Sequence, residues 1–357
     1  MRLPLGSPPV AAVRRLTAAL AAALVLAACG STPKGFLLPT AAPAAPGARH
    51  IDMLVVTTRA ASPAPGVIYG GERDTSASAA EIVVSVPPSH KVGAVEWPKH
   101  EPPDPATAFT TVSLAPSDKA NTLAWFNRMG GEHARLLVFV HGFNTRFESA
   151  VYRYAQFVAD SQADAAPLLF TWPSRGKLLD YQYDRDSAIY SRDALEEALT
   201  KAADAPAVKE MTVVAHSMGT YLTMEALRQL AIRRGGLPAK INNVVLASPD
   251  IDPQVFAHQV QALGPNPPHI TIFVSRDDRA LMVSRLLSGN LLRLGAIDPS
   301  REPFRSKLEA NGNITVIDLT KLKAGDSLNH GKFAQSPEVV KMLGQQLING
   351  QVLTQGE

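Results

Sequence analysis

Apolar runs and helical patterns alternate along most of the chain after residue 134. The runs are rich in β-branched and large apolar residues, which is typical of strands buried on both faces. They lie at 136–140, 168–172, 211–214, 243–247, 270–274 and 314–318. Helices are expected at 147–158, at about 187–203, from 220 to about 234, and at 336–348. This alternation predicts the α/β class, with a mostly parallel sheet covered by helices on both faces.

The first part of the chain is less regular. Strands are expected at 53–58 and 81–86, with loops rich in Gly, Ser and Pro between and after them. Residues 29–48 are rich in Pro and Ala and have too little apolar surface to fold, so they are interpreted as a semi-extended tether. The folded domain is therefore expected at 49–357, with ordered structure beginning near Ile51.

Residues 1–28 have the pattern of an export signal. Arg14 and Arg15 form its charged end, and the apolar run that follows is too short and too rich in small residues for a good membrane span. The run ends in Leu26-Ala27-Ala28-Cys29, which resembles the bacterial lipobox, where the cysteine is acylated after cleavage. We therefore expect a lipid-anchored envelope protein, on the outer membrane and facing the periplasm if the host has two membranes. The alternative is a chance cysteine in an ordinary signal or in a membrane-anchor helix.

Charge and cysteine content narrow the functional classes. The chain has 35 basic and 32 acidic residues, and the signal holds three of the basic ones, Arg2, Arg14 and Arg15. The mature chain then has 32 of each, which gives no support for nucleic-acid binding. Cys29 is the only cysteine, so no internal disulfide can form and a metal–thiolate site is not expected. No cofactor is predicted, and the oligomeric state stays open.

The segment Ala215-His216-Ser217-Met218-Gly219 lies between an apolar run and a helical pattern. A serine on a tight turn from strand to helix has an exposed hydroxyl beside the positive end of the helix. Ser217 is therefore the candidate nucleophile of a serine hydrolase, with Ala215 where glycine is usual.

A serine hydroxyl needs a base, and the base needs an orienting carboxylate. In parallel-sheet folds these groups lie on loops at the carboxyl ends of strands, and His330 is the only histidine after the last predicted strand. Asp278 follows the preceding strand and is the first choice for the acid, with Asp277 second and Asp252 third. The alternatives are a solvated loop histidine and aspartates paired with the neighbouring arginines.

Backbone N–H groups must face the oxyanion that forms during acyl transfer. Met218 directly follows the nucleophile, and Phe143 lies in the loop after the first strand of the alternating region. We predict these two residues as the oxyanion-hole donors, since Gly142 lets the backbone approach closely. The alternative is that His141-Gly142 only forms a tight exit from the strand.

Two further features near the predicted site, an arginine and a group of leucines, each have two interpretations. Arg175 could bind an anionic group of a substrate, but pairing with Asp184 or Asp186 is the more common role of such a residue. The leucines from Leu286 to Leu294 could form a lid over an acyl pocket, but they are more often the buried face of a helix.

Most of the chain after about residue 50 resembles a bacterial α/β-hydrolase family long catalogued as a domain of unknown function. The motifs that carry the resemblance are Val138-Phe139-Val140-His141-Gly142-Phe143-Asn144-Thr145, Phe170-Thr171-Trp172-Pro173-Ser174-Arg175-Gly176 and Ala215-His216-Ser217-Met218-Gly219. The resemblance implies a serine esterase or lipase-like enzyme with the triad in the order Ser, Asp, His.

We accordingly expect an anchored serine hydrolase that cleaves a small-molecule or lipid ester through an acyl-enzyme. The same machinery serves thioesterases and peptidases. A hydrolase-fold envelope protein that only binds is the alternative from another class.

Overall fold

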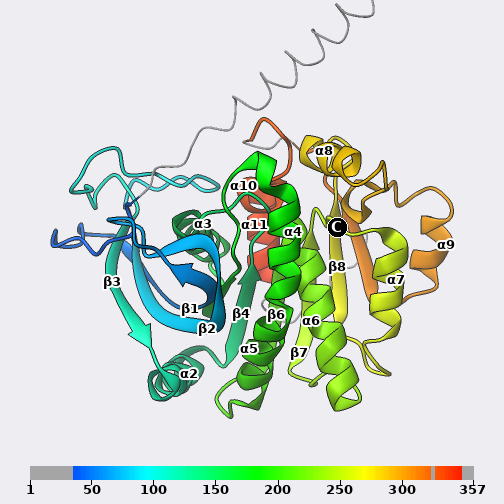
Figure 1. The fold of residues 1–357 in the computed structure, drawn as a ribbon, viewed down its shortest axis with the longest axis horizontal. Coiled ribbons are helices and arrows are strands. Elements are labelled where there is room, and N and C mark those ends of the chain that lie inside the picture. Colours follow the sequence, from blue (N-terminus) through cyan, green and yellow to red (C-terminus); the bar gives the residue numbers. More distant parts are fainter. Residues whose placement is uncertain (1–34, 323–325, 348–357) are drawn as a thin grey trace, which may run out of the picture. The chain divides into compact units, whose positions relative to one another are not determined.

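The structure is a computed structural model that describes residues 35–322 and 326–347 (Figure 1). The predicted signal and Cys29 lie outside the described residues. The described residues form one compact unit. None of the helices in the described part is long and apolar enough to cross a membrane.

A nine-stranded sheet organises the described residues, in the order β3-β2-β1-β5-β4-β6-β7-β8-β9. Only the pairs β1–β2 and β2–β3 are antiparallel, so the predicted mostly parallel sheet is confirmed. The strands are β1 (Arg49–Ala61), β2 (Tyr69–Val86), β3 (Thr110–Ser117), β4 (Arg135–Val140), β5 (Ala166–Thr171), β6 (Glu210–His216), β7 (Ile241–Ala247), β8 (His269–Val274) and β9 (Ile314–Asp318).

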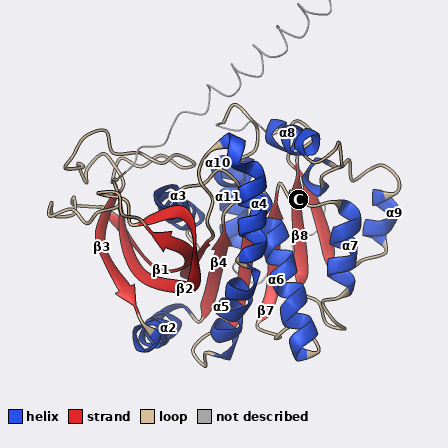
Figure 2. Cartoon of the chain, in the orientation of Figure 1, coloured by secondary structure: helices blue, strands red, loops and turns tan. Residues whose placement is uncertain are grey.

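Helices cover both faces of this sheet (Figure 2). They are α2 (Lys119–His133), α3 (Phe147–Ser161), η1 (Leu178–Asp180), α4 (Tyr181–Tyr190), α5 (Arg192–Asp204), α6 (Met218–Arg234), α7 (Pro253–Gln261), α8 (Arg279–Leu287), η2 (Leu294–Ala296), α9 (Phe304–Glu309), α10 (Lys332–Gln335), α11 (Pro337–Met342) and η3 (Leu343–Leu347). Helices α5 and α6 lie on one face and α3, α10 and α11 on the other (Figure 1).

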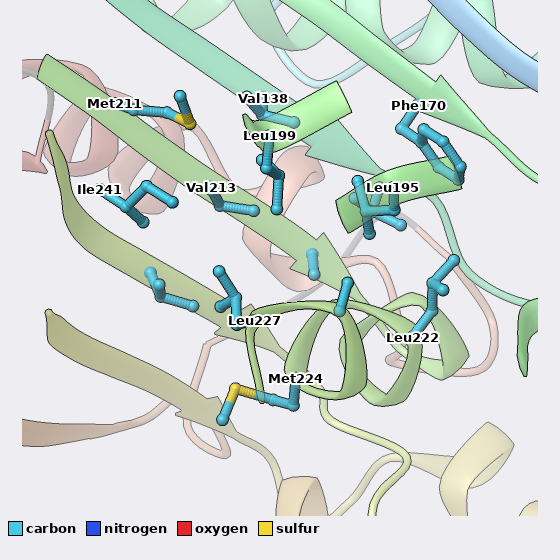
Figure 3. Close-up of a cluster of buried hydrophobic side chains, with 14 of the residues drawn as sticks. Val138, Phe170, Leu195, Leu199, Met211, Val213, Leu222, Met224, Leu227 and Ile241 are labelled. Atoms are coloured by element: carbon cyan, nitrogen blue, oxygen red, sulfur yellow. The ribbon is translucent and has the colours of Figure 1, made fainter. Parts of the chain in front are cut away.

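Two apolar cores fix these layers. On one face, side chains of α5 and α6 such as Leu199 and Leu227 pack against Val138 and Val213 of the central strands (Figure 3). On the other face, Phe139 of β4 packs against α3 and α10. Burial of these side chains from water is the main stabilising contribution, and it holds β4, β6 and β8 with their carboxyl ends at one edge.

Three regions differ from the sequence-based expectations. Strand β3 and helix α2 lie where only loops were expected, because β3 is half exposed and α2 has two glycines, Gly130 and Gly131, near its end. The helix expected at 187–203 is two helices, since Ser191 donates from its hydroxyl to Ser187 O and the backbone turns there. Within the predicted tether, Leu37 is fully buried and Thr40 N donates to Thr111 O of β3.

Candidate active site

Ser217 lies at the junction of β6 and α6, where the backbone has φ 53° and ψ −124°. A non-glycine residue in this region of φ is strained, and such strain is typical of a nucleophile elbow. The elbow packs tightly: a Cβ at Gly142 would lie 2.8 Å from Ser217 Cβ, and one at Gly219 would collide with His141 O. The loop after β4 is therefore in contact with the elbow, as required of a loop that supplies an oxyanion donor.

Asp278 and His330 form a hydrogen-bonded pair. The Nδ1–H of His330 donates to Asp278 Oδ2 at 2.7 Å, and the aspartate side chain is fully buried. The other oxygen, Oδ1, accepts from Leu281 N at 3.0 Å and caps α8. Burial opposes the charged ring, but Asp278, with Asp326 and Asp250, outweighs it and raises the pKa of His330 above 6.5.

The loop that carries His330 is held by its own hydrogen bonds. Asp326 accepts the backbone N–H groups of Leu328, His330 and Gly331, at 2.8, 3.1 and 2.6 Å. The ring of His330 lies 4.5 Å from that of His216, centroid to centroid, and His216 Nε2 lies 3.2 Å from His330 O. These contacts place the Asp–His pair beside the residue that precedes Ser217.

Within the described residues, Ser217 Oγ makes no hydrogen bond. Catalytic hydrogen bonds in unliganded enzymes are often long and shorten only when substrate binds. The geometry therefore brings Asp278 and His330 into contact and leaves the link from the hydroxyl to the ring open.

The two other candidate acids have structural partners. Asp277 Oδ1 accepts from Lys332 Nζ at 2.7 Å and from Ser275 Oγ at 2.6 Å. Burial alone would raise the pKa of Asp277, but Lys332 and Ser275 lower it. Asp252 caps α7 by accepting from Gln254 N at 2.8 Å. Neither aspartate forms a hydrogen bond with His330 within the described residues.

The opposite side of the candidate site is organised by a buried cation, Arg59 at the end of β1. Its guanidinium donates to Thr145 O at 2.7 Å, to Ser174 O at 2.8 Å and to Gly70 O at 2.9 Å. Its Nε donates to Thr171 Oγ1 at 2.6 Å. Burial lowers the pKa of Arg59 to about 10, so the side chain is still charged at neutral pH.

Asp184 of α4 completes this network. It accepts from Ser174 Oγ, from Arg175 N at 3.0 Å and from Asn144 N at 3.4 Å. Thr145 N in turn donates to Ser174 Oγ at 2.9 Å. Burial raises the pKa of Asp184 above its usual value, against the effect of these donors and of Arg59. The predicted oxyanion loop is thus fixed on both sides of Asn144, which has φ 56°.

Neither of the other two histidines near the elbow is suited to act as the base. Burial and the nearby Arg59 lower the pKa of His141 to about 3. Its Nε2 accepts from Trp172 N at 3.1 Å, which assigns the proton to Nδ1. Burial lowers the pKa of His216 well below 6.5, and His330 lowers it further.

Sequence reasoning missed the role of Arg59, and it misjudged Arg175 and α8. Arg59 was recognisable as the one charge that ends a run of strand-forming residues. Arg175 pairs with Glu72 at 3.0 Å and stacks 3.5 Å from the Tyr183 ring, rather than pairing with Asp184 or Asp186. Of the leucines from Leu286 to Leu294, for which the buried face of a helix was the more usual interpretation, Leu294 is buried but Leu286 is 72% exposed.

One cavity lies away from the elbow. It has a volume of about 930 Å³ between β2, α2 and α5, is lined mainly by apolar groups, and contains none of the predicted site residues. Among the described residues, no three His, Asp or Glu side chains are grouped so as to hold a metal ion.

Comparison with known proteins decides the family. The family described as alpha/beta hydrolase of unknown function (DUF900) matches residues 118–350, which include Ser217, Asp278 and His330. The chain belongs to this family. The fold and the resemblance predicted from sequence are thereby confirmed.

More distant similarities assign no substrate to this α/β hydrolase. A protein of Nostoc sp., described as uncharacterized protein alr1448, is 25% identical over 167 residues, or 40% of this chain and 43% of the Nostoc protein. This chain thus matches less than half the length of that relative. Carboxyl esterase 2 of the fungus Tuber melanosporum is 12% identical with a TM-score of 0.38, covering 91% of this chain and 95% of the esterase. An esterase of Pyrococcus furiosus is 10% identical with a TM-score of 0.35, covering 87% and 95%.

Proposed function

We propose that the protein is a serine hydrolase that cleaves carboxylic esters through Ser217, His330 and Asp278. The observation that carries the proposal is the 2.7 Å hydrogen bond between His330 and a buried Asp278, beside a strained serine at the end of β6. A buried carboxylate on the far nitrogen of an imidazole leaves the near nitrogen free to accept a proton.

The reaction would proceed in two halves. Ser217 Oγ attacks the acyl carbon while His330 Nε2 takes its proton, and the oxyanion forms facing Met218 N and Phe143 N. The ring then donates that proton to the leaving alkoxide as the ester C–O bond breaks and the acyl-enzyme remains. Water, deprotonated by His330, attacks the acyl-enzyme and releases the carboxylic acid and Ser217.

A fluorophosphonate probe tests the nucleophile directly. We expect wild-type protein to be labelled, Ser217→Ala not to be labelled, and Asp278→Asn to be labelled much more slowly. Asp252→Asn is the matched control, since Asn keeps a helix cap while removing a charge. Labelling of folded Ser217→Ala at the wild-type rate would contradict the proposal. Folded wild type that resists labelling would favour a protein that only binds.

We also propose that Cys29 carries the lipid that anchors the enzyme in the cell envelope. The proposal is supported by the lipobox-like Leu26-Ala27-Ala28-Cys29 at the end of the apolar run. Metabolic labelling with an alkyne fatty acid should mark the wild type and leave Cys29→Ser unmarked. Equal labelling of the two proteins would disprove acylation at this position.

A further inference from the structure

Large apolar side chains are exposed together beside the candidate active site. Leu179 of η1 is 94% exposed and Leu286 of α8 is 72% exposed. We call the exposed apolar side chains on and around α8 the α8 surface; they are Leu179, Met282, Val283, Leu286, Leu287 and Leu291. Single exposed leucines are common on soluble proteins, but such a group around one short helix is not.

The α8 surface is continuous with the catalytic groups. Helix α8 is capped by Asp278, whose carboxylate contacts His330, and it lies at the edge of the sheet where β8 ends (Figure 1). Tyr181, which follows η1, links Leu179 to this helix because its hydroxyl lies 2.9 Å from Ser284 Oγ. A ligand held on this surface would therefore lie near Asp278 and His330.

The charged side chains in and after α8 are all positive. Residues 279–297 contain three arginines and no acidic residue. Arg293 is buried and pairs with Asp250 at 3.1 Å. Arg279 donates to Ser327 O at 3.3 Å and Arg285 to Asn290 Oδ1 at 2.8 Å, and neither has a carboxylate partner within the described residues. Two exposed cations thus border the apolar side chains.

We propose that the α8 surface docks the protein onto an anionic lipid bilayer. Aliphatic side chains flanked by arginines are typical of segments that lie in the interface between lipid headgroups and acyl chains. The arginines attract lipid phosphates, and the leucines gain by leaving water for hydrocarbon. If the proposed ester hydrolysis is also correct, docking would bring lipid esters to Ser217. The binding itself does not depend on catalysis.

Vesicle co-sedimentation tests the docking. We would use residues 30–357, which contain the whole described fold and omit the signal and Cys29, because both would bind lipid by themselves. Vesicles of phosphatidylglycerol mixed with phosphatidylcholine should bind this protein, and added salt should weaken the binding. Replacing both Leu286 and Leu287 with serine should reduce binding by about tenfold or more, because both side chains are exposed and would lose their contacts with hydrocarbon.

Several matched variants separate the outcomes. Ile232→Ser removes an exposed apolar side chain from the last turn of α6 and should bind like the wild type. Arg279→Gln with Arg285→Gln should weaken binding to anionic vesicles and leave binding to pure phosphatidylcholine unchanged. Ser217→Ala should bind normally, so loss of the proposed hydrolase activity would not affect this test.

Three results would overturn the proposal. The first is that folded wild type does not bind vesicles. The second is that the Leu286→Ser/Leu287→Ser protein binds as tightly as the wild type. The third is that the wild type forms a dimer and does not bind vesicles, whereas the double variant is a monomer. Light scattering measures the last, and it would assign the α8 surface to self-association instead.

Discussion

The two sides of the candidate site are built in opposite ways. On the side of β4 and β5, the loops around Asn144 and Ser174 are held by a fully buried Arg59 and by Asp184. On the side of β8, helix α8 is anchored at its first turn by Asp278 and exposes leucines beyond it.

This difference follows the chemistry that each side would perform. Donors that stabilise an oxyanion must be fixed before the reaction, because reorganising them during the reaction would cost free energy. A surface that meets a variable apolar ligand needs exposed side chains more than fixed ones. The comparison predicts that substitutions in the network on the β4–β5 side damage stability and catalysis, whereas substitutions of the exposed apolar residues of α8 affect neither.

The largest effect on activity is expected at Asp278, the N-cap of α8. Asp278→Asn should lower kcat by about 10³- to 10⁴-fold, because the amide no longer stabilises the charged imidazole or its correct tautomer. Asn should still cap α8, so the melting temperature should change little. Steady-state kinetics on an activated ester measure the effect. A similar loss of kcat in Asp252→Asn would contradict the assignment of Asp278 as the acid that orients His330.

A large effect on stability is expected on the β4–β5 side. Arg59→Met leaves Thr145 O and Ser174 O without these donors and removes the nearby positive charge that stabilises the Asp184 carboxylate, which should cost about 3–5 kcal/mol of unfolding free energy. Arg175→Met, which breaks a surface pair with Glu72, should cost less than about 1 kcal/mol. Urea unfolding measures both. Equal losses of unfolding free energy would mean that the buried network around Arg59 stabilises the fold no more than the surface pair does.

The pH dependence of kcat/KM should test whether His330 is the catalytic base. The charged form of His330 is favoured, so its pKa lies above 6.5, and a base that is protonated cannot accept a proton. We expect kcat/KM to fall about tenfold per pH unit as pH decreases below that pKa. In Asp278→Asn the midpoint should move to lower pH. A midpoint that stays in place would exclude His330 as the group that titrates.

The smallest effects are expected on α8. With a soluble short-chain ester, Leu286→Ser should change kcat/KM by no more than about twofold and unfolding free energy by no more than about 0.5 kcal/mol. Measuring the same variant with esters in vesicles then isolates the contribution of the surface. A loss of several kcal/mol in this variant would show that Leu286 is part of the core.

The sequence predicts the sheet well, and it places the three candidate catalytic residues on loops at one edge of that sheet. Strand-forming runs are local, and loops after parallel strands must meet at one edge, so Ser217, Asp278 and His330 could be named from their places along the chain. Arg59 could not be assigned in this way, because most of its partners, such as Thr145 and Ser174, lie more than 80 residues away and its role depends on their packing. The exposure of Leu286 was misjudged for a related reason: helical spacing shows that residues share a face and not what covers that face.

The double use of the Asp278 carboxylate has a consequence for how this region can vary in length. One oxygen is bound to Leu281 N and the other to the His330 ring, so the turn from residue 278 to residue 281 must keep its length if the carboxylate is to make both bonds. An inserted residue there would break one of the two hydrogen bonds. We therefore expect insertions and deletions to be tolerated better in the loop that follows Leu287 than within the first turn of α8.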